Sequence, residues 1–389
     1  AAHARMEYQS LLCVPPPRGG GSQSRGVSTE PLGHILLRLC PMPLVHALAG
    51  REATQARARA LQEEGPAMAE VTAVGRTAFL ASRARRSEAW APRPLYPTEF
   101  DDLFRSAVFE ACLARTRLPL LARALKDGRG PGTRPTAPDE EMPQWLGIGS
   151  STAFFDLRLG QALAAGTRQV VILGSGLDCR AVRVPRPPNA ERLVFVEVDE
   201  GPLLDFKVGK LAAAGYQPYP ARLLKGNYLK FDVCRELEGA GVDPALPVFI
   251  LWEANSMYLP PSQALDVVRR LFAAFPHSTL AFDYFTPPVA GPHGPGPTGD
   301  AETDRELEIV VRAVGDGEWL LIGPWDTKVA QRELGLEVLE DLSLPEVIRL
   351  VRGDVASPLL ARHRREFEVG IHACQRFCVA RPGKRNAGG

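Results

Sequence analysis

The sequence predicts an α/β protein built on a mostly parallel sheet, and three observations lead to this prediction. Residues 169–173 read Q-V-V-I-L, a short apolar run rich in β-branched residues, which is typical of a fully buried strand. Two glycines one residue apart, Gly174 and Gly176, follow it directly. A second apolar run at 193–198 ends on Asp199. Strand, glycine turn and strand in this order are typical of a nucleotide-binding α/β unit.

The rest of the chain continues the alternation of strands and helices. Short apolar runs predict strands at 247–252, 279–285, 336–339 and 376–380. Residues 222–228, R-L-L-K-G-N-Y, are predicted to form the third strand and its exit. Helical periodicity and capping residues predict helices at 180–183, 201–214, 262–275, 302–314 and 345–351. A further helix leads into the first strand, and we expect Ser150, Ser151 or Thr152 to cap it. A Gly- and Pro-rich stretch at 286–300 predicts a long loop.

The glycine turn predicts a site for an adenosine-containing cofactor. Asp199 lies about 20 positions beyond the turn, where such a unit binds the ribose. Asp178 adds a negative charge to the turn, and Cys179 stands where a dinucleotide site has its third glycine. A pyrophosphate would be repelled there, whereas S-adenosyl-L-methionine carries a cationic sulfur and an ammonium group. The residues favour this methyl donor. They leave open an NAD(P)-dependent Rossmann oxidoreductase, a binding module without activity, and a packing turn without a ligand.

Four motifs in order resemble the leucine carboxyl methyltransferase family. They are V-V-I-L-G-S-G-L-D-C-R at 170–180, V-F-V-E-V-D at 194–199, F-K at 206–207 and L-W-E-A-N-S-M-Y-L at 251–259, with T-A-F-F-D at 152–156 as a weaker match. The resemblance implies a Rossmann-like class I methyltransferase fold: a mostly parallel seven-stranded sheet, helices on both faces and an N-terminal helical lid. It also implies an O-methyltransferase acting on a carboxylate, either a protein C-terminal leucine or a small-molecule acid.

The same resemblance, with the positions of strand ends, indicates the site residues. Those expected to bind the donor are Gly174, Ser175, Gly176, Asp178, Arg180, Asp199, Asn227, Tyr228 and Glu253. Glu253 ends the fourth strand, so we expect it to face the ammonium group or the methyl-transfer centre. Tyr258 either lines the acceptor pocket or packs in the core. Asp232 is the alternative to Asn227 for the adenine contact. A carboxylate acceptor is nucleophilic at neutral pH and requires no general base, and no histidine is given a catalytic role.

Two departures from the family pattern favour a divergent member over the enzyme directed at the phosphatase 2A catalytic subunit. The family often has Arg beside the position of Thr152, where it can meet the donor carboxylate, whereas this chain has Ser151. We expect Arg180 or Arg158 to substitute. The family usually shows an acid followed by Leu at the exit of the third strand, where this chain has Asn227 and Tyr228.

The composition and net charge of the chain limit the classes of binding partner that we expect. The formal net charge of the 389 residues is +1, which gives no electrostatic case for nucleic acid or an anionic membrane. No apolar run reaches the roughly 18 residues that span a bilayer. The seven cysteines are scattered, which is typical of reduced thiols inside a cell. Cys374 and Cys378 form one pair without a second, so we predict buried strand thiols and no metal site.

The chain divides into an N-terminal extension at 1–67, a helical lid at 68–145, a methyltransferase domain at 146–381 and a tail at 382–389. The extension is rich in turn-forming residues, which predicts disorder. Its arginines without lysine resemble a mitochondrial or plastid transit segment; the alternative is an extension upstream of Met68, with a cytoplasmic protein. Lid helices are expected at 69–90 and from 101 to 118, with Arg83, Arg85 and Arg86 on a solvated face. The oligomeric state stays open.

Overall fold

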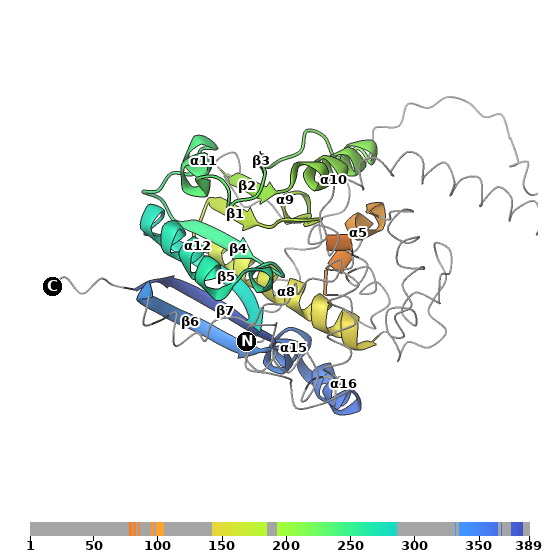
Figure 1. The fold of residues 1–389 in the computed structure, drawn as a ribbon. Helices are drawn as coiled ribbons and strands as arrows, with labels where there is room; N and C mark the ends of the chain where they lie inside the picture. Colours follow the sequence, from red (N-terminus) through yellow and green to blue (C-terminus); the bar gives the residue numbers. More distant parts are fainter. Residues whose placement is uncertain are drawn as a thin grey trace, which may run out of the picture.

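The computed structural model describes three long stretches of the chain and several shorter ones (Figure 1). The described residues are 78, 79, 81, 82, 85, 95, 96, 99–104, 142–184, 193–285, 331, 334–364, 367 and 375–383. The predicted extension at 1–67, the loop at 286–300 and the helix at 302–314 lie outside them. So do most of the two predicted lid helices and the end of the tail.

A seven-stranded sheet forms the centre of the molecule, in the order β3-β2-β1-β4-β5-β7-β6. Its strands are β1 (Gln169–Leu173), β2 (Val194–Asp199), β3 (Arg222–Lys225), β4 (Val248–Trp252), β5 (Ser278–Phe285), β6 (Leu336–Ser343) and β7 (Gln375–Pro382). The first five pair in parallel, and β7 runs antiparallel between β5 and β6. The predicted Rossmann-like, mostly parallel seven-stranded sheet is therefore confirmed. β3 forms the first part of the predicted strand and exit at 222–228, and β6 is longer than predicted.

Helices cover both faces of the sheet (Figure 1). On one face, α11 (Val233–Gly239) and α12 (Pro261–Ala274) pack on strand residues such as Val171 and Ile250. On the other, α8 (Met142–Ala164), α15 (Leu344–Arg352) and α16 (Ala356–Arg362) pack on the alternate residues, such as Ile172 and Leu251. Because both faces are covered, the central strands β1 and β4 are buried along their whole length, and their residues are apolar except for Gln169.

The helix before β1, α8, begins before the residues that were predicted to cap it. It starts at Met142, so Ser150, Ser151 and Thr152 lie in its interior, where all three are buried. The Ser150 hydroxyl accepts a hydrogen bond from Arg352 Nε of α15 at 3.0 Å. Short polar residues inside a helix can serve tertiary contacts instead of capping, and the prediction of a cap here was wrong for that reason.

A smaller apolar cluster joins the described N-terminal residues to the first β–α connection. Phe79 and residues of α5 (Glu99–Leu103) pack with Leu177 and with α10 (Gly201–Ala213). These described residues, Phe79 and α5, therefore lie against the turn that follows β1. Three short elements complete the fold: α9 (Arg180–Arg183) and the 3-10 turns η3 (Ser256–Tyr258) and η4 (Gly353–Val355). No described helix combines the length and the hydropathy that a bilayer span requires.

Candidate functional site

Three neighbouring strands end at the candidate site. The glycine turn (residues 174–179) follows β1, Asp199 is the last residue of β2, and Glu253 follows β4. In the sheet, β1 lies between β2 and β4, which are its parallel neighbours on either side. The strand order changes direction at β1. Ligands of open α/β sheets bind at the carboxyl ends of strands at such a point.

The side chain of Asp199 fixes the glycine turn. Its Oδ2 accepts a hydrogen bond from the backbone N–H of Gly176 at 2.6 Å, and its Oδ1 accepts one from the N–H of Glu200 at 2.7 Å. The backbone N–H of Ser175 also donates to the carbonyl of Val198 at 3.2 Å. Burial raises the pKa of Asp199 by more than these bonds lower it. The carboxylate is therefore held in place at the strand end, beside the turn.

Both glycines adopt the left-handed backbone conformation that favours glycine. At Gly174, with φ of 60°, an added Cβ would lie 2.3 Å from Cγ of Asn255. At Gly176, with φ of 49°, it would lie 3.0 Å from Cβ of Ala78. Glycine is therefore needed at both positions for two reasons: the backbone angles of the turn and the close approach of neighbouring residues. The turn lies between Asn255, in the loop after β4, and Ala78.

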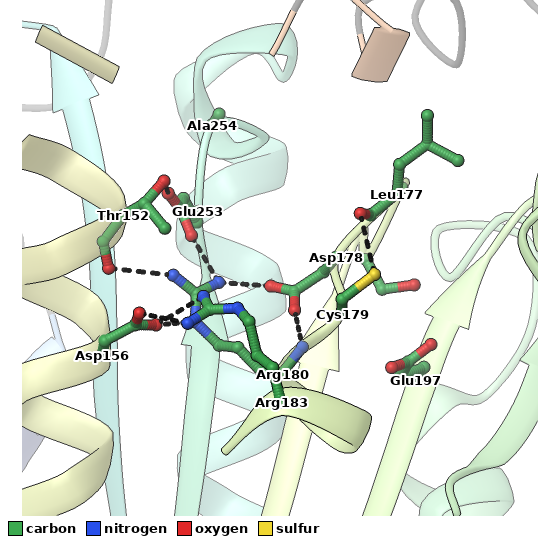
Figure 2. Close-up of polar contacts among 12 residues, drawn as sticks. Thr152, Asp156, Leu177, Asp178, Cys179, Arg180, Arg183, Glu197, Glu253 and Ala254 are labelled. Carbon is green, nitrogen blue, oxygen red and sulfur yellow. Dashed lines mark hydrogen bonds and ion pairs between the residues drawn. The ribbon is translucent and has the colours of Figure 1, made fainter. Parts of the chain in front are cut away.

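Arg180, the first residue of α9, is the centre of an ion network below the turn (Figure 2). Its guanidinium pairs with Asp156 at 2.7 Å, with Glu253 at 2.6 Å and with Asp178. It also donates to the Thr152 carbonyl at 3.2 Å. The side chain is 2% exposed. This one arginine therefore joins α8, the glycine turn and the end of β4.

The network carries an excess of negative charge. Arg183 adds a second guanidinium on Asp156, at 2.8 Å from Oδ1. The three carboxylates of Asp156, Asp178 and Glu253 thus face two cations. Burial alone would raise the pKa of Asp178, but Arg180 and Arg183 outweigh it and hold this pKa below its usual value. Asp178 is therefore ionised, and a cationic ligand would be favoured here over an anion.

A buried lysine supports the turn from the other side. Lys207 of α10 and Glu197 of β2 are fully buried and form an ion pair of 2.6 Å. The Lys207 ammonium also donates to the Ser175 hydroxyl at 3.3 Å, and the Tyr219 hydroxyl donates to Glu197 at 2.6 Å. The F-K motif at 206–207 thus has a physical explanation: its lysine connects β2 with the glycine turn.

Asp283 of β5 fixes the loop after β4. Its Oδ1 accepts the backbone N–H of Ala254 at 2.6 Å, and its Oδ2 accepts a hydrogen bond from Gln375 of β7 at 3.0 Å. Ala254 has φ of 50° and is the one non-glycine residue with positive φ in the described part of the chain. Burial, with the charge of Glu253 adding to it, raises the pKa of Asp283 to about 7.

Comparison with known proteins identifies the family. The sequence profile named leucine carboxyl methyltransferase matches residues 73–272, slightly more than half of the chain. This protein belongs to the leucine carboxyl methyltransferase family.

Relatives of this family member include a candidate S-adenosyl-L-methionine-dependent methyltransferase of Mycobacterium sp. strain KMS, 35% identical over 190 residues. A protein of the same description from Mycolicibacterium paratuberculosis is 34% identical over 204 residues. These alignments cover 49% and 52% of this chain and 59% and 63% of the relatives, so the chain spans less than two thirds of their length.

Two solved structures are similar in outline. A DUF574 family protein of Streptomyces avermitilis has a TM-score of 0.43 at 16% identity, over 77% of this chain and 96% of its own. A candidate methyltransferase of Thermobifida fusca has a TM-score of 0.44 at 15% identity, over 73% and 93%.

In this leucine carboxyl methyltransferase family member, the residues predicted for the adenine contact differ in exposure and in their hydrogen-bond partners. Asn227 is exposed, and its side chain accepts a hydrogen bond from the N–H of Leu229 at 2.9 Å. Tyr228 is buried and receives a hydrogen bond from Trp252 Nε1 at 3.2 Å. Asp232 is exposed and caps α11. Tyr258 lies in η3, partly buried, in the loop that Asp283 holds.

The predicted substitutes for an arginine at position 151 have other partners. Arg180 is bound to the three carboxylates of the network, and Arg158 forms a bidentate pair with Glu340 of β6 at 2.5 and 2.6 Å. Ser151 itself faces Glu253, with 3.5 Å from its hydroxyl to Oε1. Both arginines are therefore already paired with carboxylates of the protein.

Several residues of the site carried no role in the sequence analysis. Asp156 stands in the weaker T-A-F-F-D match, which was a usable signal for it. Asn255 stands in the L-W-E-A-N-S-M-Y-L match, which was also a usable signal. Asp283 lies outside the quoted motifs, and its importance depends on the fold of the loop after β4. Arg85 was predicted on a solvated face, but its side chain is only 15% exposed.

Cys378 is a buried strand thiol, as predicted. No cluster of metal-binding side chains occurs among the residues that the structure describes.

Proposed function

We propose that this protein is an S-adenosyl-L-methionine-dependent methyltransferase that transfers the methyl group to an oxygen of its acceptor. The observation that carries the proposal is the glycine turn, fixed by Asp199 and bordered by carboxylates in excess of cations. This chemistry fits a donor with a cationic sulfur and an ammonium group. Asp199 would hold the ribose, and Glu253 the ammonium. The family match favours the same donor.

The turn is poorly suited to the pyrophosphate of a dinucleotide. A phosphate is bound by free backbone N–H groups at a helix N-terminus. Here α9 spans four residues, and its first N–H, that of Arg180, donates to the Asp178 carboxylate at 2.6 Å. A carboxylate of the protein therefore occupies the position that a phosphate would need. This arrangement disfavours the NAD(P)-dependent alternative.

The bound donor would supply an already activated methyl group, so the protein needs mainly to align the reacting atoms and exclude water. Acceptors of the carboxylate class are ionised at neutral pH and need no general base. We therefore favour a carboxylate acceptor, either a protein C-terminal leucine or a small-molecule acid. Tyr258, in the loop beside Glu253, is the proposed side chain for the acceptor pocket.

Two measurements test the proposal. Calorimetric titration should detect binding of S-adenosyl-L-methionine and of S-adenosylhomocysteine, and no binding of NAD. Donor labelled in its methyl group should then label peptides that end in a free leucine carboxylate, or small carboxylic acids, and should not label the same peptides with an amidated C-terminus. Binding of NAD alone would support an oxidoreductase. Donor binding without label on any acceptor would support an inactive binding module.

A further inference from the structure

The side chain of Asn255 lies over the glycine turn with its amide oxygen already bound. Trp252 Nε1 donates a hydrogen bond to Asn255 Oδ1 at 3.1 Å, and the Tyr228 hydroxyl donates a second one to the same oxygen. An indole N–H can only donate, so the atom that faces it must be the amide oxygen and not the amide nitrogen. The orientation of the Asn255 amide is therefore fixed by the protein.

The amide nitrogen of Asn255 lies beside the start of the turn. A Cβ added to Gly174 would lie 2.4 Å from this nitrogen, so the nitrogen occupies the space that a side chain at Gly174 would need. Within the part of the chain that the structure describes, it donates no hydrogen bond, and the side chain is half-buried. Its N–H groups are therefore available to a ligand bound at the carboxyl ends of the strands.

Asn255 and Glu253 leave the loop after β4 in different directions. Glu253 turns toward α8, where its carboxylate contacts Thr152 (Figure 2). Asn255 turns toward Trp252 and Tyr228, which belong to the apolar cluster under α11 and α12. Because α8 and α12 cover opposite faces of the sheet, the two side chains serve opposite sides of the turn. With the ammonium of the donor expected at Glu253, the nucleoside end is expected on the side of Asn255.

The adenine of the donor needs a hydrogen-bonding partner on that side. Asn227 is exposed, and its side-chain oxygen already accepts the N–H of Leu229. The hydroxyl of Tyr228 is bound to Asn255. Adenine presents ring nitrogens that accept hydrogen bonds and carry no charge, and an uncharged amide N–H group suits such an acceptor.

We propose that the Asn255 amide nitrogen donates a hydrogen bond to an acceptor nitrogen of the donor's adenine ring. This inference rests on the proposed function and adds a specificity-determining residue to that site. Trp252 and Tyr228 are positioning residues, because their hydrogen bonds to the amide oxygen turn the amide nitrogen toward the site. Tyr228 then acts on the adenine through Asn255 and not by touching it.

The test uses two ligands without a cationic sulfur, so that a change in the charge of the protein has little effect of its own. Calorimetry measures the affinities of the parent protein and of Asn255→Asp for S-adenosylhomocysteine and for methylthioadenosine, which lacks the amino-acid end. Aspartate keeps an oxygen for Trp252 and Tyr228 but places a second oxygen where the amide nitrogen was. The expected result is a loss of about 10- to 100-fold for both ligands, because the lost contact lies in the part that they share. Gln263→Glu, at an exposed position of α12, adds the same charge and should alter neither affinity.

Deaza forms of methylthioadenosine, each with one ring nitrogen replaced by C–H, separate a direct contact from an effect on the turn. For one of these forms Asn255→Asp should cost less than about threefold, because the contact is already absent in the parent complex. An equal cost for every deaza form would mean that Asn255 only supports the turn, and the inference would be wrong. A loss confined to S-adenosylhomocysteine would place the contact at the amino-acid end and would overturn it too.

Asn255→Ala provides the same comparison if the aspartate variant does not fold. Trp252 Nε1 then keeps the Tyr228 hydroxyl as an acceptor at 3.2 Å, so this buried N–H group still has a partner. The loss of affinity should again disappear for one of the deaza forms. A failure of the proposed function looks different: the parent protein then binds neither S-adenosylhomocysteine nor methylthioadenosine.

Discussion

The carboxylate of Asp199 at the end of β2 accepts the backbone N–H of Gly176 in the turn after β1, at 2.6 Å. This contact couples the residue predicted to hold a ribose to the turn predicted to hold the rest of the donor. Asp199→Ala should weaken binding of S-adenosyl-L-methionine by about 1–3 kcal/mol, because charge-assisted hydrogen bonds are lost. Calorimetric titration measures it. Asp205→Ala, at an exposed carboxylate of α10, is the matched control and should leave the affinity unchanged. Unchanged affinity in a folded Asp199→Ala variant would contradict the ribose role.

Gly174→Ala should destabilise the protein and impair donor binding. The left-handed backbone costs a residue with a Cβ about 1–2 kcal/mol, and the new Cβ would collide with the side chain of Asn255. Thermal unfolding and donor titration measure the two effects. Gly209→Ala, in the helix α10 with open space around it, is the control and should stabilise the protein by about 0.5–1 kcal/mol. If Gly174→Ala were as stable as the parent, the close approach of Asn255 would be in doubt.

Lys207→Met should cost about 3–5 kcal/mol of unfolding free energy, because it leaves the Glu197 carboxylate buried without its cation. Urea denaturation measures the loss. The double variant with Glu197→Gln should recover much of it, since the buried charge is then absent and the Tyr219 hydroxyl can still donate to the amide oxygen. If the double variant were no more stable than Lys207→Met, the loss would come from packing and not from the ion pair.

Asp283→Asn should change how stability depends on pH. The folded protein holds the Asp283 proton up to a pKa of about 7, whereas the unfolded chain loses it near the ordinary value of 3.8. Stability therefore falls as pH rises from about 4 to about 7, by about 4 kcal/mol for this group. The variant lacks that loss, and rotation of the Gln375 amide can restore its hydrogen bond. Urea denaturation across this pH range measures the difference. A stability difference that is the same at every pH would contradict a raised pKa.

The strands and most helices could be predicted because their signals are local. An apolar run such as 169–173 indicates a buried strand from neighbouring residues alone, and the structure has that strand with the same bounds. The start of α8 was missed for the opposite reason. Thr152 is a good cap by its chemistry, but its hydroxyl lies 3.3 Å from Glu253, 101 residues later in the chain. No local pattern contains that distance.

Site residues that belong to a motif could be predicted from the sequence. The ion-pair partners of charged side chains could not. The glycines and Asp199 followed from their spacing after two strands. Arg180 was expected to bind the donor, and the structure shows in addition that it pairs with three carboxylates, which its position in the sequence did not indicate. Arg85 was expected in solvent, and it lies against the turn. A sequence shows that a side chain is charged, but not which opposite charge the folded chain brings to it.

The sequence by itself determined the α/β alternation, the glycine turn and the acid that ends the neighbouring strand, because backbone angles and hydrophobic period are properties of consecutive residues. Only the tertiary structure decided which residues surround that turn. Glu253 and Asn255 reach it because the parallel strands β1 and β4 end at one edge of the sheet, and Ala78 and Lys207 reach it from helices that pack beside the turn. Coulomb attraction acts over ångströms in space rather than over positions in the chain.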